Sequence, residues 1–276
     1  MYGFGYRYSP KGIYVPSGGG GALDPDAEAF LTAATITDPT EISAVNQLVI
    51  DMKTAGIWTK MKAVYPFVGG TATTHKWNLV NPRDLDAAFR LTFSGGWTHS
   101  STGALPNGTN GYAQTYFNIG TDFTNANRGS AGGYWRTVLP NINYFFGVNV
   151  PVLAVNSRFW IRSAGGTKDH HAGGATLLRE SSVTDYSGFS AMSRRASNDM
   201  FAIKRDGTYI TLTTNVTTAF SNATLPLSAV NQSGTITGFH NSELAYMYLS
   251  DDLTQSEMTD LRSAVINFQT TLGRAV

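Results

Sequence analysis

From Trp58 to about Ser250 the chain consists of short apolar or alternating runs separated by Gly, Asn and Pro. Segments such as "FRLTFSGG", "SRFWIRSA" and "ELAYMYLS" have the length and the two-residue period of β-strands. No helical pattern alternates with these runs, so parallel βαβ units are disfavoured. The 29 glycines and the 12% of aromatic residues also fit strands joined by many turns. The pattern therefore predicts a mainly β protein, an antiparallel β-sandwich.

The clearest hairpin signal is "FAIKRDGTYITL", residues 201–212. Asp206 and Gly207 suit a two-residue turn between two alternating runs. This turn predicts that Ile203 lies opposite Ile210 and that Phe201 lies opposite Leu212 on the same face.

Two helices are expected before the β-rich region. "DPDAEAFLTAA" begins with Asp24 as N-cap and Pro25 at the first helical position, and "DPTEISAVNQLVIDMKTAG" repeats this arrangement from Asp38. Gly56 is a natural end for the second helix. The apolar stripe of that helix is formed by Ile42, Val45, Val49 and Met52. We expect the stripe to pack on the sheet of the same chain.

A third helix is expected at residues 254–272. Thr254 and Glu257 have the spacing of a capping box, Leu253 can pack on Met258, and Gly273 ends the helix. The apolar positions form one seam, made by Met258, Leu261, Val265, Phe268 and Leu272. Two heptads are too few for a coiled coil, so packing on the sandwich or on the Ile42 helix is expected.

The first residues, "MYGFGYRYSP", carry an aromatic ring at every second position. In an extended segment this period places Tyr2, Phe4, Tyr6 and Tyr8 on one face, which must be buried against something. Four glycines, residues 18–21, follow as a flexible tether. The pattern predicts an anchoring arm over residues 1–21, a helical adaptor over 22–56, and a sandwich with its helix over 57–276.

The overall charge limits the partners. The formal net charge is +1 and charged residues make up 14% of the 276-residue chain, so no basic excess would attract nucleic acid or an anionic membrane. The longest apolar stretch is too short and too interrupted for a membrane span. The start is aromatic and Gly-rich, which is not typical of a signal peptide. The absence of cysteine excludes disulfides and thiolate metal sites.

The hairpin over residues 201–212, followed by "GFHNSELAYMYLSDDLTQSEMTDLRSAV", resembles the last part of concanavalin A-like jelly rolls of the laminin-G and pentraxin type. In this family, Gly238 and Phe239 would open a strand, and Glu243 stands where Asp is commoner. Leu253, Thr254 and Glu257 match the closing signature. The resemblance implies a concanavalin A-like jelly roll with a lectin-like character.

The chain combines "KMKAVYPFVGGTATTHKWNLVNPRDLDAAFRLTFSGGWTHSSTGALPNGTNGYA" with a terminal "FQTTLGR". With these phrases, residues 24–113 and 236–274 look similar to structural proteins of tailed bacteriophages, especially those that infect Bacteroidetes. This resemblance implies a virion component, of head-fibre, tail-fibre or appendage type. It also implies other virion proteins as partners of the N-terminal arm, a homo-oligomeric state and a location in the virion. Residues 114–200 carry no phrase that adds to the resemblance.

The sequence contains no acidic run of the kind that glucanases of this fold class use for catalysis. Asp84 and Asp86 in "PRDLDAAF" are the nearest cluster, but Pro82 and Arg83 beside them favour a turn with satisfied carboxylates. No nucleophile elbow, phosphate loop or zinc-protease motif is present. We therefore expect a protein that is not an enzyme.

Two further polar segments were weighed as binding sites. "GGTKDHHAGG" is interpreted as a solvated hairpin tip, since polar clusters flanked by Gly are ordinary turns. Adjacent histidines on a strand point to opposite faces, so only a loop could bring both to one metal. "DFTNANRG" offers Asp122, Asn125 and Asn127 as oxygen ligands for Ca²⁺, but without a regular spacing. No cofactor is expected, and the metal site stays undetermined. "YSGFSAMSRRAS" contains Arg194 and Arg195, which could hold an acidic sugar or simply lie on a solvated face.

The first hypothesis is thus a non-enzymatic structural component of a phage particle with a lectin-like domain. The alternative is a carbohydrate-binding module for host-surface glycans, in which exposed Trp97, Tyr134 and Trp135 would stack on sugar faces. A capsule depolymerase is disfavoured by the missing carboxylate pair.

Overall fold

The computed structural model describes residues 7–8, 14–15, 22–137, 143–152, 155–163, 165–173, 177–212 and 219–276. The helices are α1 Pro25–Ala34, α2 Pro39–Thr54, α3 Ala72–His75 and α4 Gln255–Thr271, with 3-10 turns at Trp58–Lys60 and Asp86–Ala88. The strands are β1 Arg7–Tyr8, β2 Tyr14–Val15, β3 Met61–Tyr65, β4 Thr92–Ser94, β5 Trp97–Ser100, β6 Gly103–Pro106, β7 Tyr112–Asn118, β8 Gly129–Trp135, β9 Tyr144–Val152, β10 Val155–Ser163, β11 Thr167–Ala172, β12 Leu178–Ser181, β13 Gly188–Ala196, β14 Asp199–Ile203, β15 Tyr209–Leu212, β16 Thr224–Leu227, β17 Val230–Gln232, β18 Thr235–Thr237 and β19 Leu244–Ser250.

Two large sheets form the body of the protein. One sheet, which we name the helix-covered sheet, has the order β15-β14-β13-β8-β19-β6-β5, with β3 paired to β19. The other, the distal sheet, has the order β12-β11-β10-β9-β16-β7-β4, with β17 and β18 attached through β9. All strand pairs are antiparallel except the pairing of β17 with β9. The predicted mainly β antiparallel sandwich with N-terminal and C-terminal helices is confirmed.

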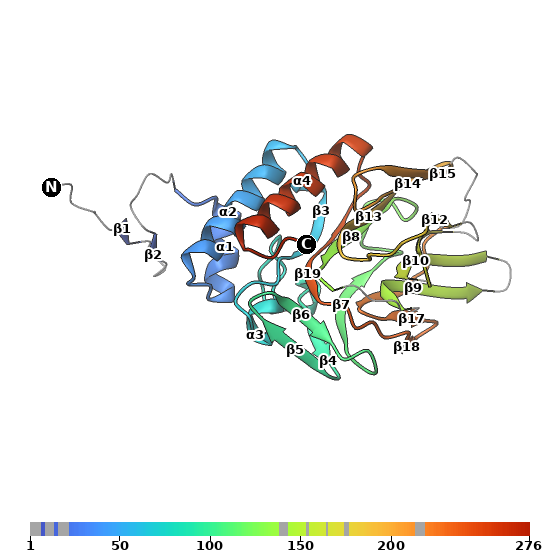
Figure 1. Cartoon of the computed structure of the whole chain (residues 1–276), viewed down its shortest axis with the longest axis horizontal. Coiled ribbons are helices and arrows are strands. Elements are labelled where there is room, and N and C mark those ends of the chain that lie inside the picture. The colour runs from blue at the N-terminus through green and yellow to red at the C-terminus, as the bar shows by residue number, and fades with distance from the viewer. Residues whose placement is uncertain are drawn as a thin grey trace.

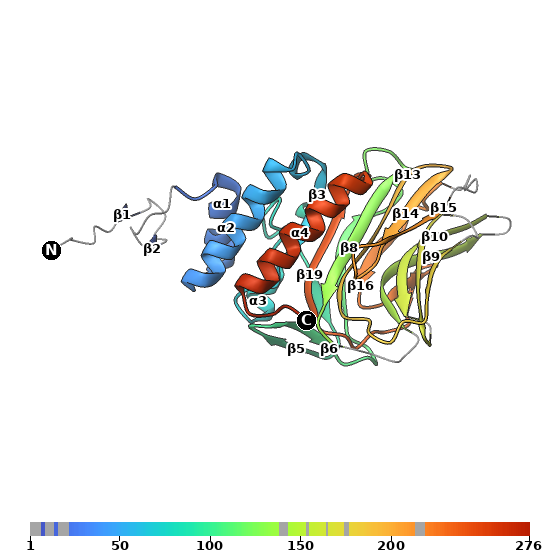
Figure 2. The ribbon, with the colours of Figure 1, turned by 45° about the horizontal axis from the view of Figure 1, so that its top comes forward.

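The molecule has three layers. Helices α2 and α4 lie against the outer face of the helix-covered sheet, α1 lies beside α2, and the distal sheet lies on the side away from these helices (Figures 1 and 2). One hydrophobic cluster fills the space between the helices and the helix-covered sheet, and a second fills the space between the sheets. The helices of residues 22–56 thus pack on the sandwich itself.

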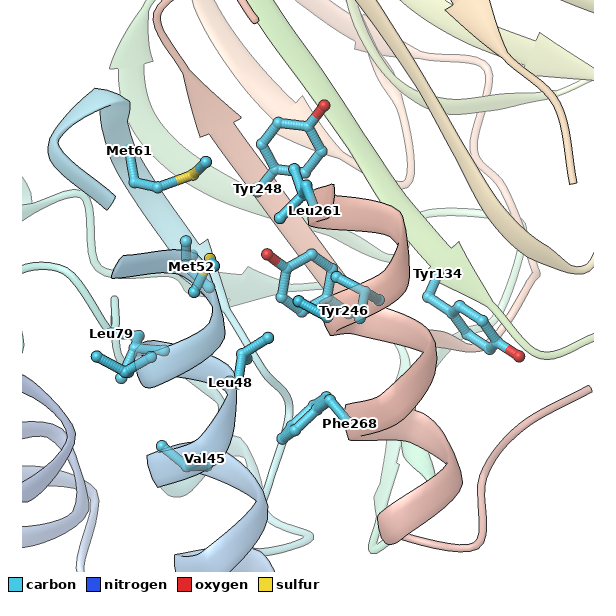
Figure 3. Packing of buried hydrophobic residues seen from close by; sticks show 14 of the residues in the cluster. Val45, Leu48, Met52, Met61, Leu79, Tyr134, Tyr246, Tyr248, Leu261 and Phe268 are labelled. Atoms are coloured by element: carbon cyan, nitrogen blue, oxygen red, sulfur yellow. The ribbon is translucent and has the colours of Figure 1, made fainter. Parts of the chain in front are cut away.

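The first cluster is built by the predicted helix stripes. Val45, Met52 and Phe268 are buried between α2, α4 and the sheet (Figure 3). Tyr246 and Tyr248 of β19 point toward these helices. Because each large apolar side chain contributes about 1.5–3 kcal/mol on burial, this interface stabilises both the helices and the sheet. The apolar seam of α4 therefore packs both on the sheet and on α2, the two surfaces that were expected as alternatives.

The residues that cap the helices are those that the sequence predicted. Asp24 and Asp38 cap α1 and α2, with Pro25 and Pro39 at the first helical positions. Thr254 and Glu257 form the predicted capping box at the start of α4. These signals are local, so they could be recognised without knowledge of the fold.

The predicted register of the 201–212 hairpin is wrong by one residue. Ile203 pairs with Tyr209, and Ala202 pairs with Ile210. The loop holds three residues instead of two, since Lys204 N donates to Thr208 O and Gly207 N donates to Lys204 O. Gly207 has φ +89° and absorbs the extra residue as a bulge. As a result Ile203 faces the helices while Ile210 packs on the core between the sheets.

Two further expectations concern the start of the last strand and the N-terminal arm. Gly238 and Phe239 precede the last strand instead of opening it, since β19 begins at Leu244. Of the anchoring residues, Tyr2, Phe4 and Tyr6 lie outside the described residues. The backbone of Tyr8 pairs with Tyr14 in a two-stranded ribbon, and its side chain is not among those described. Anchoring by the arm stays a prediction.

The turn geometry gives the first testable prediction. Gly207→Val should lower the free energy of unfolding by about 1–3 kcal/mol, because a β-branched residue is strained at positive φ. Lys204→Thr, three positions earlier, should change it by less than about 0.5 kcal/mol. Urea unfolding followed by circular dichroism measures both. Equal stability of the two variants would contradict the bulged turn.

Candidate functional site

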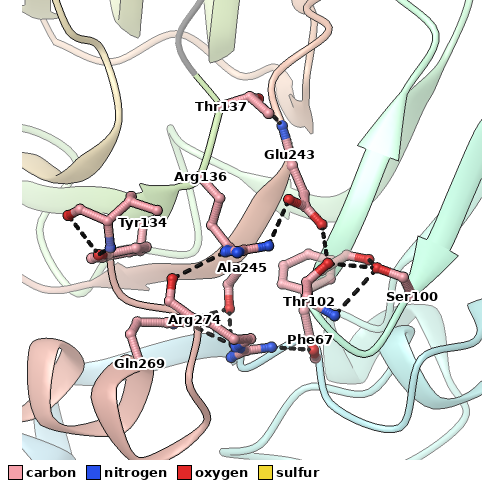
Figure 4. A network of polar contacts seen from close by, with 12 residues as sticks. Phe67, Ser100, Thr102, Tyr134, Arg136, Thr137, Glu243, Ala245, Gln269 and Arg274 are labelled. Atoms are coloured by element: carbon pink, nitrogen blue, oxygen red, sulfur yellow. Dashed lines mark hydrogen bonds and ion pairs between the residues drawn. The ribbon is translucent and has the colours of Figure 1, made fainter.

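Two of the three aromatic residues predicted to bind glycans are buried. Tyr134 is 3% exposed and Trp135 is 1% exposed, so the expectation of exposed rings is wrong for both. The Tyr134 hydroxyl accepts a hydrogen bond from Val276 N at 2.8 Å (Figure 4). Trp135 packs on Phe145 between the sheets, with ring centroids 4.5 Å apart. Both belong to β8, whose seven residues are all buried between neighbouring strands, a placement that composition alone does not reveal.

The polar network beside Tyr134 is structural. Arg274 is 1% exposed and donates to the carbonyl oxygens of Phe67, Pro66 and Ala245 and to Gln269 Oε1. Figure 4 shows it beside the ion pair of Arg136 and Glu243. Burial lowers the pKa of Arg274 to about 10, so it stays charged at neutral pH. These hydrogen bonds use the donors of Arg274 within the protein. They connect the segment after α4 to the end of β3 and to β19, and they leave no ligand site at this arginine.

Trp97 is the half-buried member of the predicted set. Its Nε1 donates to Ser94 O at 3.0 Å and to Tyr112 O at 3.2 Å, so the indole N–H is used within the protein. Its ring contacts Phe93 and stacks near His99. His99 Nδ1 lies 2.9 Å from Nδ1 of buried His75, whose pKa burial lowers to about 3. Only the ring face of Trp97 remains for a ligand.

The acidic candidates have local roles. Asp84 pairs with Lys76 at 2.6 Å and Asp86 pairs with Arg90 at 2.8 Å, as expected for satisfied carboxylates in a turn. Asp122 Oδ2 accepts from Asn118 N. In the Asn125–Asn127 segment, the Asn125 side chain accepts from the Asn127 backbone.

Two searches cover the described part of the chain. Among those residues, no group of three or more His, Asp or Glu side chains could hold a metal ion. None of the helices there is long and apolar enough to cross a membrane.

The segment "TKDHHA" is not the predicted solvated tip. It forms β11, paired on one side with β10 and on the other with β12, and Lys168, Asp169, His170 and His171 are each at most 1% exposed. The tip lies just before it, at Gly165 and Gly166, both at positive φ. The polar side chains alternate between two faces of the sheet, as expected for a strand. Polarity was therefore misread as exposure.

The inward-facing half of β11 is stabilised inside the sandwich. Lys168 Nζ donates to Tyr186 O at 3.3 Å, and burial lowers the pKa of this lysine to about 8. His170 Nε2 lies 3.0 Å from Ser190 Oγ of the opposite sheet. Arg194, which the sequence offered as a sugar-binding residue, is also buried here and donates to Ala172 O. These groups face the core and are closed to a ligand.

The other half of β11 belongs to a polar and aromatic surface of the distal sheet. Phe159 and Ile161 of β10 point into the core, so their neighbours Trp160 and Arg162 point outward. The register then aligns side chains across four strands. One row runs from Gly147 through Trp160 to His171, and the next runs from Tyr144 through Arg162 and Asp169 to Arg179. We name Tyr144, Trp160, Arg162, Asp169, His171 and Arg179 the distal-face cluster.

The rings and one guanidinium of this cluster pack around Trp160. The Trp160 ring lies 5.5 Å from Tyr144 in an edge-on arrangement and 4.5 Å from His171. The Arg162 guanidinium lies over Trp160, 5.0 Å from its centroid. Gly147 makes this possible, because a Cβ there would lie 2.2 Å from Trp160 Cβ. The indole is thereby enclosed and is 4% exposed.

Asp169 is the charged centre of the cluster. It accepts bonds from Arg162 at 2.9 Å and from both Nε and Nη2 of Arg179, at 2.7 and 3.0 Å. Burial alone would raise the pKa of Asp169, but the hydrogen bonds from Arg179 and Arg162 outweigh it and hold the pKa below its ordinary value. Burial lowers the pKa of His171 to about 3, aided by Arg158, so the imidazole is neutral at physiological pH.

The sequence contained a signal for this surface that went unused. In "RFWIR" the apolar Phe159 and Ile161 alternate with Arg158, Trp160 and Arg162. Period 2 places the arginines and the tryptophan on one face of a strand. The partners in β11 and β12 could not be assigned, since their register depends on the fold.

The fold recurs in solved structures at low sequence identity. A mutant of Trypanosoma rangeli sialidase that displays trans-sialidase activity matches 82% of this chain with TM-score 0.53 and 10% identity, and the chain spans 39% of that protein. Domain 4 of a GH43 extracellular arabinanase from Geobacillus stearothermophilus, in complex with arabinotriose, matches 73% of this chain and 98% of the domain, with TM-score 0.45 and 15% identity. The CBM40 of the Ruminococcus gnavus IT-sialidase, bound to α2,3-sialyllactose, matches 49% of this chain and 82% of that domain, with TM-score 0.38 and 12% identity. No protein-family model and no curated protein matches the chain.

The electrostatics of Asp169 give a prediction for stability. Because its folded pKa lies below the unfolded value of 3.8, its contribution is present above about pH 4 and is lost as the pH falls through the folded pKa. Asp169→Asn should lower the free energy of unfolding by about 1.5–3 kcal/mol at pH 7, with the difference shrinking toward pH 2–3. Unfolding curves across this pH range test it.

Asp199→Asn is the matched control. Asp199 pairs with Arg195 at 2.8 Å, but both side chains are about 40% exposed, so the change should cost less than about 1 kcal/mol. A difference between wild type and Asp169→Asn that stays constant down to low pH would contradict the assigned charge.

Proposed function

We propose that this chain is a non-catalytic glycan-binding domain whose sugar contacts the distal-face cluster. The observation that carries the proposal is the pair of half-buried side chains Tyr144 and Arg162, held in place by the enclosed Trp160 ring on the sheet face away from the helices. Binding sites for small polar molecules combine ring surfaces with a few fixed polar groups, and this face has both. The β-sandwich that it shares with the sialidase supplies the frame.

The absence of catalysis is part of the proposal. Hydrolysis of a glycosidic bond ordinarily requires two carboxyl groups facing the bond. The distal-face cluster contributes one, Asp169, and two arginines hold it. Asp84 and Asp86 are engaged by Lys76 and Arg90 in an exposed turn. The arrangement favours recognition over proton transfer.

A glycan array tests the function. The wild-type chain should bind at least one glycan class, and Tyr144→Ala should weaken that binding roughly tenfold, about 1.4 kcal/mol. Trp97→Ala is the comparison variant, because Trp97 is the remaining solvent-accessible ring of the original prediction. Loss of binding in Trp97→Ala alone would move the site to the β4–β5 edge. Release of reducing sugar from a bound glycan would overturn the non-catalytic assignment.

The resemblance of residues 24–113 and 236–274 to phage structural proteins favours a second function. We propose that the glycan-binding domain is a fibre or appendage component of a virion, held by its N-terminal arm. Aromatic residues at alternating positions suit strand addition to a neighbouring chain, and the glycine tether gives the arm reach.

Deletion of residues 1–17 tests this role. The shortened chain should fold with an unchanged melting temperature, because the helices and both sheets lie in later residues. It should no longer be found in purified particles by mass spectrometry, whereas the full chain should be. Normal incorporation of the deletion variant would place the attachment elsewhere, and absence of the full chain from particles would remove the virion role.

A further inference from the structure

Several polar atoms on the distal face are buried without a hydrogen-bond partner in the protein. They are Trp160 Nε1, both ring nitrogens of His171, Arg162 Nε and Asn149 Oδ1. All come from the adjacent strands β9, β10 and β11, and Asn149 lies one register row beyond Trp160, opposite Arg158. An unpartnered buried polar group costs about 1–3 kcal/mol, so several at one place indicate that something else supplies their partners.

The chemistry of these atoms specifies the missing partner. The indole and guanidinium groups are donors only, and neutral His171 offers one donor and one acceptor. Asn149 Oδ1 adds a second acceptor. The guanidinium groups of Arg162 and Arg179 pair with one carboxylate, Asp169, and Arg158 adds a third positive charge near His171. A ligand that satisfies this set brings acceptors for the donors and a hydroxyl for the acceptors, and an anionic group also suits the excess of guanidinium charge.

We propose that the distal-face cluster binds an acidic sugar, with the carboxylate or sulfate held by the partly exposed guanidinium groups of Arg162 and Arg179 and by the unpaired donors of Arg162 and Trp160 beside them. This inference rests on the glycan-binding proposal and narrows it to a ligand class. Arg162 is suited to the task because Nη2 binds Asp169 while Nε has no partner. An anion can thus be bound without breaking the Asp169 ion pairs.

A groove elsewhere in the described part of the chain does not suit this ligand. It encloses about 500 Å³ between the end of α1, the start of α2 and the β5–β6 turn. Its charged lining residues are Asp38 and Glu41, and it has no cation. An acidic sugar would be repelled there by the two carboxylates.

The experiment compares acidic sugars with matched neutral ones by isothermal titration calorimetry. The probes are 3′-sialyllactose against lactose, trigalacturonate against its methyl ester, and N-acetylglucosamine 6-sulfate against N-acetylglucosamine. At least one acidic probe should bind ten times or more tightly than its neutral partner. Its affinity should fall with rising NaCl, since the guanidinium groups of Arg162 and Arg179 are partly in water.

Variants locate the binding. Arg179→Gln should lower the affinity for the acidic probe about tenfold. Arg179→Lys should restore part of that affinity, because lysine keeps the positive charge but lacks the planar guanidinium that binds a carboxylate through two donors. Trp160→Phe keeps a ring and removes the indole donor, so it should also weaken binding. Arg83→Gln is the control, since Arg83 is exposed and contacts Asn81. Circular dichroism and melting curves confirm that each variant is folded.

The outcomes separate the two proposals. Equal affinity within every probe pair, or acidic binding that Arg179→Gln and Trp160→Phe leave unchanged, overturns the acidic-sugar inference. If neutral glycans bind and Tyr144→Ala abolishes that binding, the glycan-binding function stands without the acidic class. If none of the acidic probes binds, the inference fails, and the glycan array then decides the function by itself.

Discussion

Strand β19 is buried on both faces, and both hydrophobic clusters depend on it. Tyr246 and Tyr248 pack toward the helices, while Met247 and Leu249 pack between the sheets. Its neighbour β8 fits closely beside it because Gly133 has no side chain, since a Cβ there would lie 2.6 Å from the Tyr246 carbonyl oxygen. With one strand shared by two cores, the helices and the sandwich stabilise each other, and the distal sheet alone keeps an outer face without helices (Figure 2).

Features that depend on a single element could be predicted from the sequence. The caps of α1, α2 and α4 and the alternation of the strands are local patterns, and the structure confirms them. The hairpin register could not be predicted, because it depended on Gly207 adding one residue to the loop. The candidate site was missed for a related reason. Asp169 was interpreted as exposed because no partner for its charge could be recognised nearby in the sequence. Its partner Arg179 lies on a different strand, and only the fold brings the two together.

The two sheets differ in what lies on their outer faces. On its outer face the helix-covered sheet presents rings such as Phe189 and Tyr248 to the helices. On its own outer face the distal sheet presents Arg162 and Asp169. A sheet face that carries charged and aromatic side chains in register rows is rigid, since each row is fixed by backbone hydrogen bonds on adjacent strands. Recognition groups on such a frame need little rearrangement when a ligand binds.

Burying polar and charged groups costs free energy, and on the distal face this cost bears most directly on the proposed role in ligand binding. A carboxylate buried at Asp169 is tolerable because two guanidinium groups pair with it, so this part of the cluster is complete without a ligand. The indole N–H of Trp160 and the nitrogens of His171 have no such compensation. Native proteins keep few buried polar atoms in this state. The completed ion pairs hold this surface in shape, and the unpaired donors beside them are the groups to which our proposal assigns a ligand.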